Sequence, residues 1–214
     1  MKSHTRGFYG IGDFSWPGSL TVGADHTLLL ARHGQTEWNL VRRWQGRSDV
    51  PLNETGRAQA LALAEQLRSE PLERALVSPL LRARETAEAV AALRSGPGFQ
   101  VEPRLLEMDP GRWEGRFDEE VEATEPEAAA AWHADPLGHG PPGGESGLDV
   151  ARRVAPLLDE LSAGPEGSRV LLVGHQFTLA IFTCLVTGTP LDQVRSRFLK
   201  SAELLRLRLP HRAV

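Results

Sequence analysis

The chain has little cysteine, no excess of basic residues and no long apolar run. Its single cysteine, Cys184, excludes an internal disulfide and is predicted to be a buried apolar residue. The formal net charge of −4 provides no basic surface of the kind that nucleic-acid binding usually requires. The apolar run 178–186 is too short and interrupted to span a bilayer, and residues 1–26 contain no signal-like apolar core. We therefore expect a cytoplasmic protein that binds neither nucleic acid nor membranes.

The length and composition are those of an ordinary globular protein. With 214 residues, 41% of them hydrophobic, the chain is large enough to bury a good core as one domain. Residues 1–26 are rich in glycine and aromatics without a helical or strand period, so they are predicted to be an N-terminal extension of unknown role. Residues 27–214 form the predicted domain. The sequence leaves the oligomeric state open, and a homodimer is one option.

Short apolar runs alternate with helical patterns through the predicted domain. Strands are predicted at 27–31, 74–78, 168–175 and 202–209, and a further unit begins at residue 99. Helices are predicted at 51–69, 79–93, 147–164 and 177–188. Apolar strands that are each followed by a helix are typical of a parallel sheet with both faces covered. The predicted class is α/β, with three α/β/α layers around a mainly parallel sheet.

Two of the predicted helices carry start signals. Asn53 is a candidate N-cap for the first, in which Ala60, Leu63, Ala64 and Leu67 fall on one face. Pro79 suits the first turn of the second.

Residues 117–146 interrupt this alternation. An acidic, alanine-rich stretch with a helical pattern is followed there by a loop rich in proline and glycine. We interpret the region as a small helical and loop insertion over the edge of the sheet that binds the ligand. The simpler interpretation is a solvated surface helix and a plain connection.

Two histidines occupy equivalent places after two predicted strands. His33 follows LLLA and His175 follows VLLVG, and ligands of open α/β sheets bind outside the carboxyl ends of the strands. If the two strands are adjacent, both imidazoles face one crevice. Arg82, one turn into the helix after a third strand, and Arg32, beside His33, can reach the same edge.

This set of side chains suits a phosphoryl group. Two guanidinium groups, two imidazoles and the backbone amides around Gly34 match a tetrahedral dianion. A neutral imidazole can act as the nucleophile, since its ordinary pKa is about 6.5 and nearby cations favour the uncharged form. The other histidine then donates hydrogen bonds.

Each of these residues also has a simpler interpretation. A lone histidine after a strand is more often structural, and an arginine on a charged helix is usually at the surface. The remaining histidines are predicted to be solvated in loops or at the ends: His4, His26, His133, His139 and His211. A metal site needs three or four ligands, and neither HGQTEWN nor GHQF supplies a second histidine or cysteine nearby, so no metal and no cofactor are predicted.

Six segments, in order along the chain, resemble those of the histidine phosphatase superfamily, also called the phosphoglycerate mutase-like family. They are RHGQTEWN, QGRSDVPLNETGRAQA, SPLLRARETA, LLEMDPGRWEG, GGES and VLLVGH, and together they cover most of residues 28–180. The resemblance implies that His33 is the phosphate-accepting nucleophile. It also implies that Arg32 and Arg82 clamp the phosphate and that His175 is the second histidine of the pocket.

The resemblance extends to further positions of the pocket. Asn39 matches a phosphate-contacting position, and Gln45 and Gly46 match the loop that lines the substrate pocket. Glu107 matches the general acid. Thr36 matches a position that supports the loop, although a hydroxyl in a turn can equally be a local cap.

Departures from the mutases favour the phosphatase branch of the family. Glu107 is followed by MDPGRWEG, whereas mutases commonly read glutamate, arginine, histidine, tyrosine, glycine, and Pro110 stands where many relatives have an aromatic residue. The acidic region 117–146 argues against a second phosphate on the substrate. The favoured partner is therefore a small phosphorylated metabolite that carries one phosphate.

The sequence thus predicts a phosphomonoesterase that works through a covalent phosphohistidine. Three alternatives remain open at this stage. A mutase would use the same pocket to isomerise a phosphoglycerate, and a specialised ribazole-phosphate phosphatase would share every motif. A non-catalytic binding module is disfavoured because both histidines, both arginines and the glutamate are present.

Overall fold

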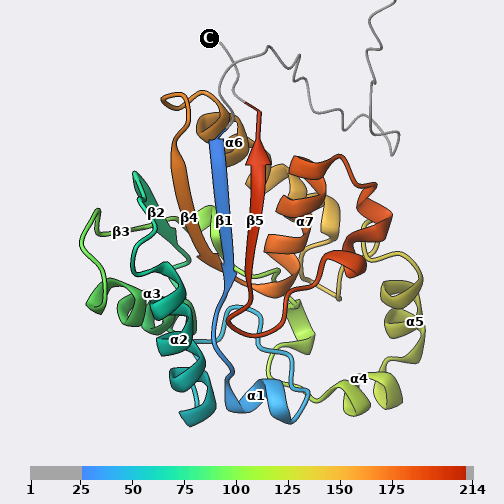
Figure 1. Cartoon of the computed structure of the whole chain (residues 1–214). Coiled ribbons are helices and arrows are strands. Elements are labelled where there is room, and N and C mark those ends of the chain that lie inside the picture. The colour runs from blue at the N-terminus through green and yellow to red at the C-terminus, as the bar shows by residue number, and fades with distance from the viewer. Residues whose placement is uncertain (1–25, 211–214) are drawn as a thin grey trace, which may run out of the picture.

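A five-stranded sheet forms the centre of the molecule (Figure 1). The structure is a computed structural model, and it describes residues 26–210. The strands are β1 (His26–Arg32), β2 (Arg74–Val77), β3 (Phe99–Val101), β4 (Arg169–Gly174) and β5 (Leu204–Leu209). They lie in the order β3-β2-β4-β1-β5, and only β5 runs antiparallel to its neighbour. The predicted mainly parallel sheet is confirmed.

Helices α2 (Glu54–Leu67) and α3 (Leu81–Ala92) cover one face of this sheet, and α6 (Gly147–Ser162) and α7 (Gln176–Thr187) cover the other. Helices α1 (Glu37–Leu40), α4 (Asp118–Thr124) and α5 (Pro126–Ala134) lie beyond the end of the sheet at which β1 terminates (Figure 1). Three short 3-10 helices lie at Pro103–Leu105, Gly111–Trp113 and Leu191–Arg197.

The two layers of helices are fixed by the alternation of side chains along the strands. In β1, Leu29 and Ala31 belong to the core with α2 and α3, whereas Leu28 and Leu30 belong to the core with α6 and α7. All four side chains are fully buried. The predicted three-layer α/β/α architecture is therefore confirmed.

The sequence signals for helix starts have mixed outcomes. Asn53 is the N-cap of α2, and its side-chain oxygen accepts a hydrogen bond from Gly56 N at 2.8 Å. The prediction for Pro79 is wrong, because α3 begins at Leu81. Leu80 is the N-cap residue there, and the carboxylate of Asp49 accepts the Leu81 N–H at 2.6 Å instead. A carboxylate from another loop thus supplies the cap that the local sequence lacks.

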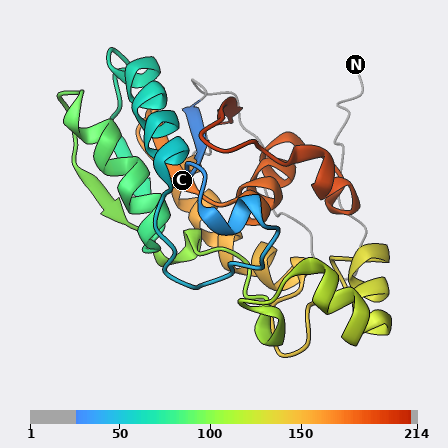
Figure 2. The same cartoon turned by 90° about the horizontal axis from the view of Figure 1, so that it is seen from below.

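The region 117–146 folds into α4 and α5 followed by a loop. Viewed from below, these helices lie beside α1 at the end of the sheet where β1 terminates (Figure 2). The simpler interpretation as a solvated surface helix does not hold for α5, since Trp132 is only 6% exposed. The Trp132 ring packs against Trp44 and Phe177, with centroid separations of 6.0 and 5.3 Å. Aromatic contacts hold the insertion against the rest of the domain.

Side chains outside the sheet edge also test the sequence predictions. His26 is not solvated: it is fully buried in β1, and its Nε2 lies 3.1 Å from the Ser162 carbonyl. His133 and His139 are exposed as expected, and His4 and His211 lie outside the described residues. Cys184 is buried, as predicted. Within residues 26–210, no single helix is long and apolar enough to cross a bilayer.

Candidate active site

A pocket of about 420 Å³ opens at the carboxyl ends of the parallel strands. β1 and β4 are adjacent, with Arg32 paired to Gly174, so the residues that follow, His33 and His175, are brought together. Their ring centroids lie 5.2 Å apart. Arg82, the second residue of α3, reaches the same point from the next strand-to-helix unit. The crevice expected from the sequence is therefore present.

Seven of the eight predicted site residues line this pocket. They are Arg32, His33, Asn39, Gln45, Gly46, Arg82 and Glu107. His175 is not among the lining residues, since its side chain is fully buried beside His33.

The hydrogen bonds of His33 determine which of its nitrogens can attack. Nδ1 lies 2.6 Å from the Gly34 carbonyl, which can only accept, so Nδ1 carries the hydrogen. Nε2 is then unprotonated and accepts a hydrogen bond from Arg82 Nε at 3.3 Å. Burial, reinforced by the charges of Arg82 and Arg32, lowers the pKa of His33 well below its usual 6.5. The ring is therefore neutral at physiological pH, and its Nε2 carries no hydrogen.

Arg82 is held almost entirely inside the protein. Its Nη1 and Nη2 donate to the carbonyls of Ser48 and Gly46 at 2.8 and 2.7 Å. Burial lowers the pKa of Arg82 to about 10, and the nearby carboxylate of Glu107 opposes that shift. The guanidinium remains charged at neutral pH, in a place where little water screens it.

Arg32 provides the second buried cation of the pocket. Its Nη1 donates to the Leu199 carbonyl at 2.8 Å, which fixes the side chain beside His33. Its Nε is buried and has no hydrogen-bond partner among the described residues. A donor left in this condition suits an anionic ligand, since an unpaired buried N–H is costly.

His175 has one nitrogen engaged and one free. Nε2 lies 2.7 Å from the Ser78 hydroxyl, whereas Nδ1 is buried without a partner among the described residues. Burial and the Arg82 charge lower the pKa of His175 well below 6.5, so this ring is also neutral. The free Nδ1 is the atom of His175 that remains for a ligand held at His33.

The expectation that backbone amides around Gly34 bind the phosphate is wrong. Gly34 N donates to the Thr86 hydroxyl at 3.0 Å, and Gln35 N donates to the Gln59 side chain at 2.9 Å. His33 N is bonded to the Gly174 carbonyl. These amides are already satisfied within the protein, so side chains must supply the donors.

Glu107 is positioned by the start of α7. Its carboxylate accepts hydrogen bonds from the Phe177 and Thr178 amides at 3.3 and 3.1 Å, and from the Thr178 hydroxyl at 3.2 Å. The N-cap residue, His175, makes no side-chain cap of its own, so Glu107 caps this helix from another segment. The two other carboxylates of its segment, Asp109 and Glu114, do not line the pocket.

The loop between β1 and α2 supports the remaining predicted residues. Thr36 is the N-cap of α1, where it forms a capping box with Asn39 and also donates to Gln45 Oε1 at 2.8 Å. Gly46 has φ +47°, and a Cβ there would lie 2.1 Å from the Pro110 ring. Glycine is thus required at this position on two counts, since Pro110 closes the space above it.

The outer pocket contains cations that the sequence did not single out. Arg42, Arg43 and Arg195 line it, along with Trp38, Trp44, Trp132, Phe177 and Phe198. Arg43 and Arg195 have no carboxylate partner among the described residues, whereas Arg42 pairs with Asp118 at 3.2 Å. No local pattern marks these arginines, because they come from segments about 150 residues apart in the chain.

Several acidic residues of the insertion pair with arginines that do not line the pocket. Glu125 pairs with Arg112 and Arg116, and Glu120 also pairs with Arg116. Within the described residues of this region, Asp118 is the one acidic side chain that lines the pocket. The net charge of residues 117–146 therefore does not indicate the charge of the pocket wall.

Comparison with known proteins agrees with this geometry. The model of the histidine phosphatase superfamily (branch 1) matches residues 28–213. The chain belongs to branch 1 of the histidine phosphatase superfamily. This histidine phosphatase is 41% identical to a glucosyl-3-phosphoglycerate phosphatase of Mycolicibacterium vanbaalenii over 172 residues. The alignment covers 77% of this chain and 76% of the relative.

Two further relatives are a protein named as a probable mutase and a phosphatase of known structure. A protein of Photorhabdus laumondii named "Probable phosphoglycerate mutase GpmB" is 36% identical over 86% of this chain and 85% of its own length. The solved structure of a mycobacterial glucosyl-3-phosphoglycerate phosphatase with VO3 superposes with a TM-score of 0.77 at 35% identity. It covers 85% of this chain and 92% of that one. Family and fold together identify this histidine phosphatase as a phosphoric monoester hydrolase.

Proposed function

We propose that the hydrolase works through a phosphohistidine formed on Nε2 of His33. The observation that carries this proposal is the pair of hydrogen bonds that leaves Nε2 unprotonated while Nδ1 donates to Gly34. Nε2 forms a bond to phosphorus as the ester P–O bond breaks, and Glu107 gives a proton to the leaving oxygen. The Nδ1–H bond to the carbonyl stabilises the positive charge that develops on the ring.

The second step returns the enzyme to its starting state. Water attacks phosphorus, the Glu107 carboxylate takes one of its protons, and the P–N bond breaks to release phosphate and neutral His33. Arg32, Arg82 and Nδ1 of His175 are the donors that we assign to the phosphoryl oxygens. Asn39, Gln45 and Gly46 complete the wall of the pocket. Phosphoryl transfer depends mostly on positioning and charge stabilisation, so these parts suffice.

The test uses two variants and two substrates in single-turnover experiments. His33→Ala is expected to abolish both turnover and acid-labile labelling by radioactive phosphate ester. Glu107→Gln should slow phosphorylation by glycerol phosphate roughly 100- to 10,000-fold and by nitrophenyl phosphate far less, because nitrophenolate leaves without a proton. Labelling that persists in His33→Ala would move the nucleophile, and equal losses on both substrates would remove Glu107 as the acid.

We also propose that the alcohol part of the substrate carries an anionic group, such as a carboxylate. Arg43 and Arg195 support this proposal, since both line the same pocket as Arg32 and Arg82 and neither has an acidic partner among the described residues. The three relatives described above are all named for phosphoglycerate compounds, which carry a carboxylate. Release of free phosphate from 3-phosphoglycerate, without 2-phosphoglycerate, distinguishes a phosphatase from a mutase. A cytoplasmic location and a homodimer remain predictions.

A further inference from the structure

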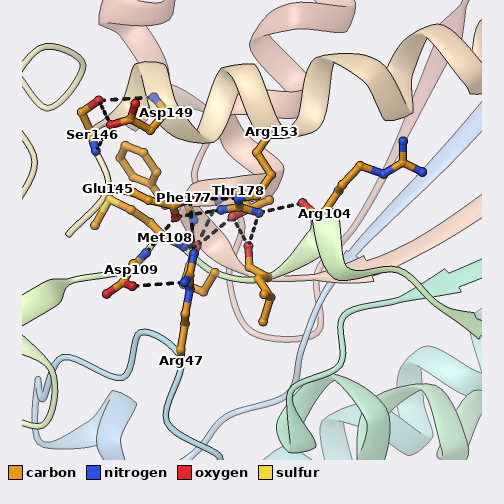
Figure 3. A network of polar contacts seen from close by, with 12 residues as sticks. Arg47, Arg104, Met108, Asp109, Glu145, Ser146, Asp149, Arg153, Phe177 and Thr178 are labelled. Carbon is orange, nitrogen blue, oxygen red and sulfur yellow. Dashed lines mark hydrogen bonds and ion pairs between the residues drawn. The ribbon is translucent and has the colours of Figure 1, made fainter.

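The GGES segment, singled out in the sequence, forms a polar network beside the pocket. Glu145 of this segment makes a two-pronged ion pair with Arg153 of α6, with both N···O distances 3.0 Å (Figure 3). The side chains are only 19% and 17% exposed. A paired geometry of this kind, largely shielded from water, fixes the orientation of both groups.

The ion pair holds the backbone on both sides of Glu107. On the amino-terminal side, Nη1 of Arg153 donates to the carbonyls of Arg104 and Leu106 at 2.7 and 3.0 Å. On the other side, Glu145 Oε2 accepts the Asp109 amide at 3.0 Å, and Glu145 N donates to the Asp109 carbonyl at 2.8 Å. The segment that carries Glu107 is thus clamped at residues one and two positions away from it.

Arg47 links the same network to the loop that binds Arg82. Figure 3 shows Arg47 beside Asp109 and Glu145. Its guanidinium lies 3.1 Å from an Asp109 carboxylate oxygen and 3.3 Å from a Glu145 carboxylate oxygen. The carbonyl of the preceding residue, Gly46, accepts a hydrogen bond from Arg82. The loop of the phosphate clamp and the segment of Glu107 therefore contact one ion pair.

We propose that Glu145 and Arg153 are positioning residues, which set the place of the Glu107 carboxyl relative to the leaving oxygen. This inference rests on the proposed role of Glu107. Loss of the Glu145 charge leaves Arg153 with an uncompensated charge and frees it to move, so the carbonyls that it holds lose their anchor. A misplacement of about 1 Å in a reacting group costs up to roughly 100-fold in rate.

The test is the same comparison of leaving groups, applied to Glu145→Gln. Phosphorylation by glycerol phosphate is expected to slow about 10- to 100-fold, and phosphorylation by nitrophenyl phosphate less than about 3-fold. In the double variant Glu107→Gln/Glu145→Gln, the second change should add nothing on glycerol phosphate, because its effect passes through Glu107. Arg153→Lys, which keeps the charge but loses the fork, should give the same pattern and replaces Glu145→Gln if that variant does not fold.

Glu70 offers a matched control. Its carboxylate is 12% exposed and pairs with Arg169 and Arg206 at 2.6 and 3.2 Å, at the amino end of β4 and far from the pocket. Glu70→Gln should lower stability without changing the ratio of the two substrate rates. Equal losses on both substrates in Glu145→Gln, or a further loss in the double variant, would overturn the positioning role. Failure of Glu107→Gln to distinguish the substrates would overturn the proposed function instead.

Discussion

Arg43 lies over the Trp38 ring, with its guanidinium carbon 4.1 Å from the ring centroid, and lines the pocket. Its Nε donates to the Gly115 carbonyl, which leaves its other nitrogens for a ligand. A hydrogen bond to a charged group contributes about 1.5–3 kcal/mol, or roughly 10- to 100-fold in kcat/KM. The cation–π contact holds the guanidinium in place before the substrate binds.

Replacing Arg43 therefore tests the proposed substrate class. Arg43→Gln is expected to lower kcat/KM for 3-phosphoglycerate about 10- to 100-fold, with little change for glycerol 3-phosphate, which has a hydroxymethyl group in place of the carboxylate. Arg42→Gln is the control, since Arg42 already pairs with Asp118 and its side chain is 75% exposed. Steady-state phosphate release measures both. An equal loss on the two substrates would show that Arg43 does not recognise the carboxylate.

At the scale of single residues, the sequence predicted the chemistry at the strand ends but not the rest of the pocket. His33 and His175 could be placed because each follows an apolar strand, and Arg82 because it begins the next helix. Arg43 and Arg195 could not, since nothing local distinguishes them from solvated arginines. The prediction that the Gly34 amide binds phosphate was wrong because this amide donates to the Thr86 hydroxyl. Thr86 lies 52 positions away in the chain, so no local pattern reveals the contact.

At the scale of elements, α2 approaches the loop after β1 at two glycines. A Cβ on Gly34 would lie 2.4 Å from the Gly56 carbonyl oxygen, and a Cβ on Gly56 would lie 2.0 Å from the Gln35 carbonyl oxygen. Both obstacles are backbone atoms, so neither side can yield by rotating a side chain. The start of α2 thus determines how close the His33 loop lies to the sheet.

Gly56→Ala should accordingly damage both stability and catalysis. Overpacking of this kind costs about 1–3 kcal/mol, and the displaced loop carries His33 and Asn39, so kcat should fall as well. Gly98→Ala is the matched control, because a Cβ there meets nothing within 4 Å. Urea unfolding and single-turnover kinetics check the two effects. Wild-type kcat in a folded Gly56→Ala protein would contradict the link between α2 and the site.

Long elements were predictable from periodicity, and short ones were not. The predicted strand 27–31 and the buried face of Ala60, Leu63, Ala64 and Leu67 are both confirmed. The four-residue helix α1 and the three 3-10 helices were not predicted, since they have too few turns to show a period. Pro79 was misplaced because the cap of α3 comes from Asp49, which no local pattern indicates.

At the scale of the whole molecule, the two buried histidines couple stability to pH. In the native state the pKa values of His33 and His175 lie well below 6.5, so both rings stay neutral as the pH falls. The unfolded chain takes up protons on both below about pH 6.5, which favours unfolding. The free energy of unfolding is therefore highest, with respect to these two groups, above about pH 6.5, and it decreases as the pH falls below that value.

Each histidine should therefore lower the free energy of unfolding as the pH falls below about 6.5, because only the unfolded chain gains its proton. His175→Gln removes one of the two groups, so its free energy of unfolding should decrease less than that of the wild type between roughly pH 7.5 and 5.5. Guanidinium chloride unfolding in phosphate-free buffer measures the difference. Identical pH dependence in the two proteins would mean that His175 titrates normally in the fold.

The position of β1 in the sheet has a consequence for how the protein is made. β1 is synthesised before both of its neighbours, which come from far downstream of it: β4 from 169–174 and β5 from 204–209. The Ala202 amide donates to the His33 carbonyl, and the Leu199 carbonyl holds Arg32. The nucleophile and one clamp are thus held by residues that leave the ribosome long after β1 does.

Enzymatic activity should consequently appear abruptly during translation, once β5 has left the exit tunnel. A stalled chain that exposes residues up to Lys200 contains every residue assigned to the reaction, yet should release no phosphate. One with β5 fully outside the exit tunnel should be active, because domains of this kind fold as units. Stalled ribosome complexes with linkers of graded length, assayed with nitrophenyl phosphate, measure the point of onset. Activity in the chain that stops at Lys200 would show that the catalytic strand matures without its final partner.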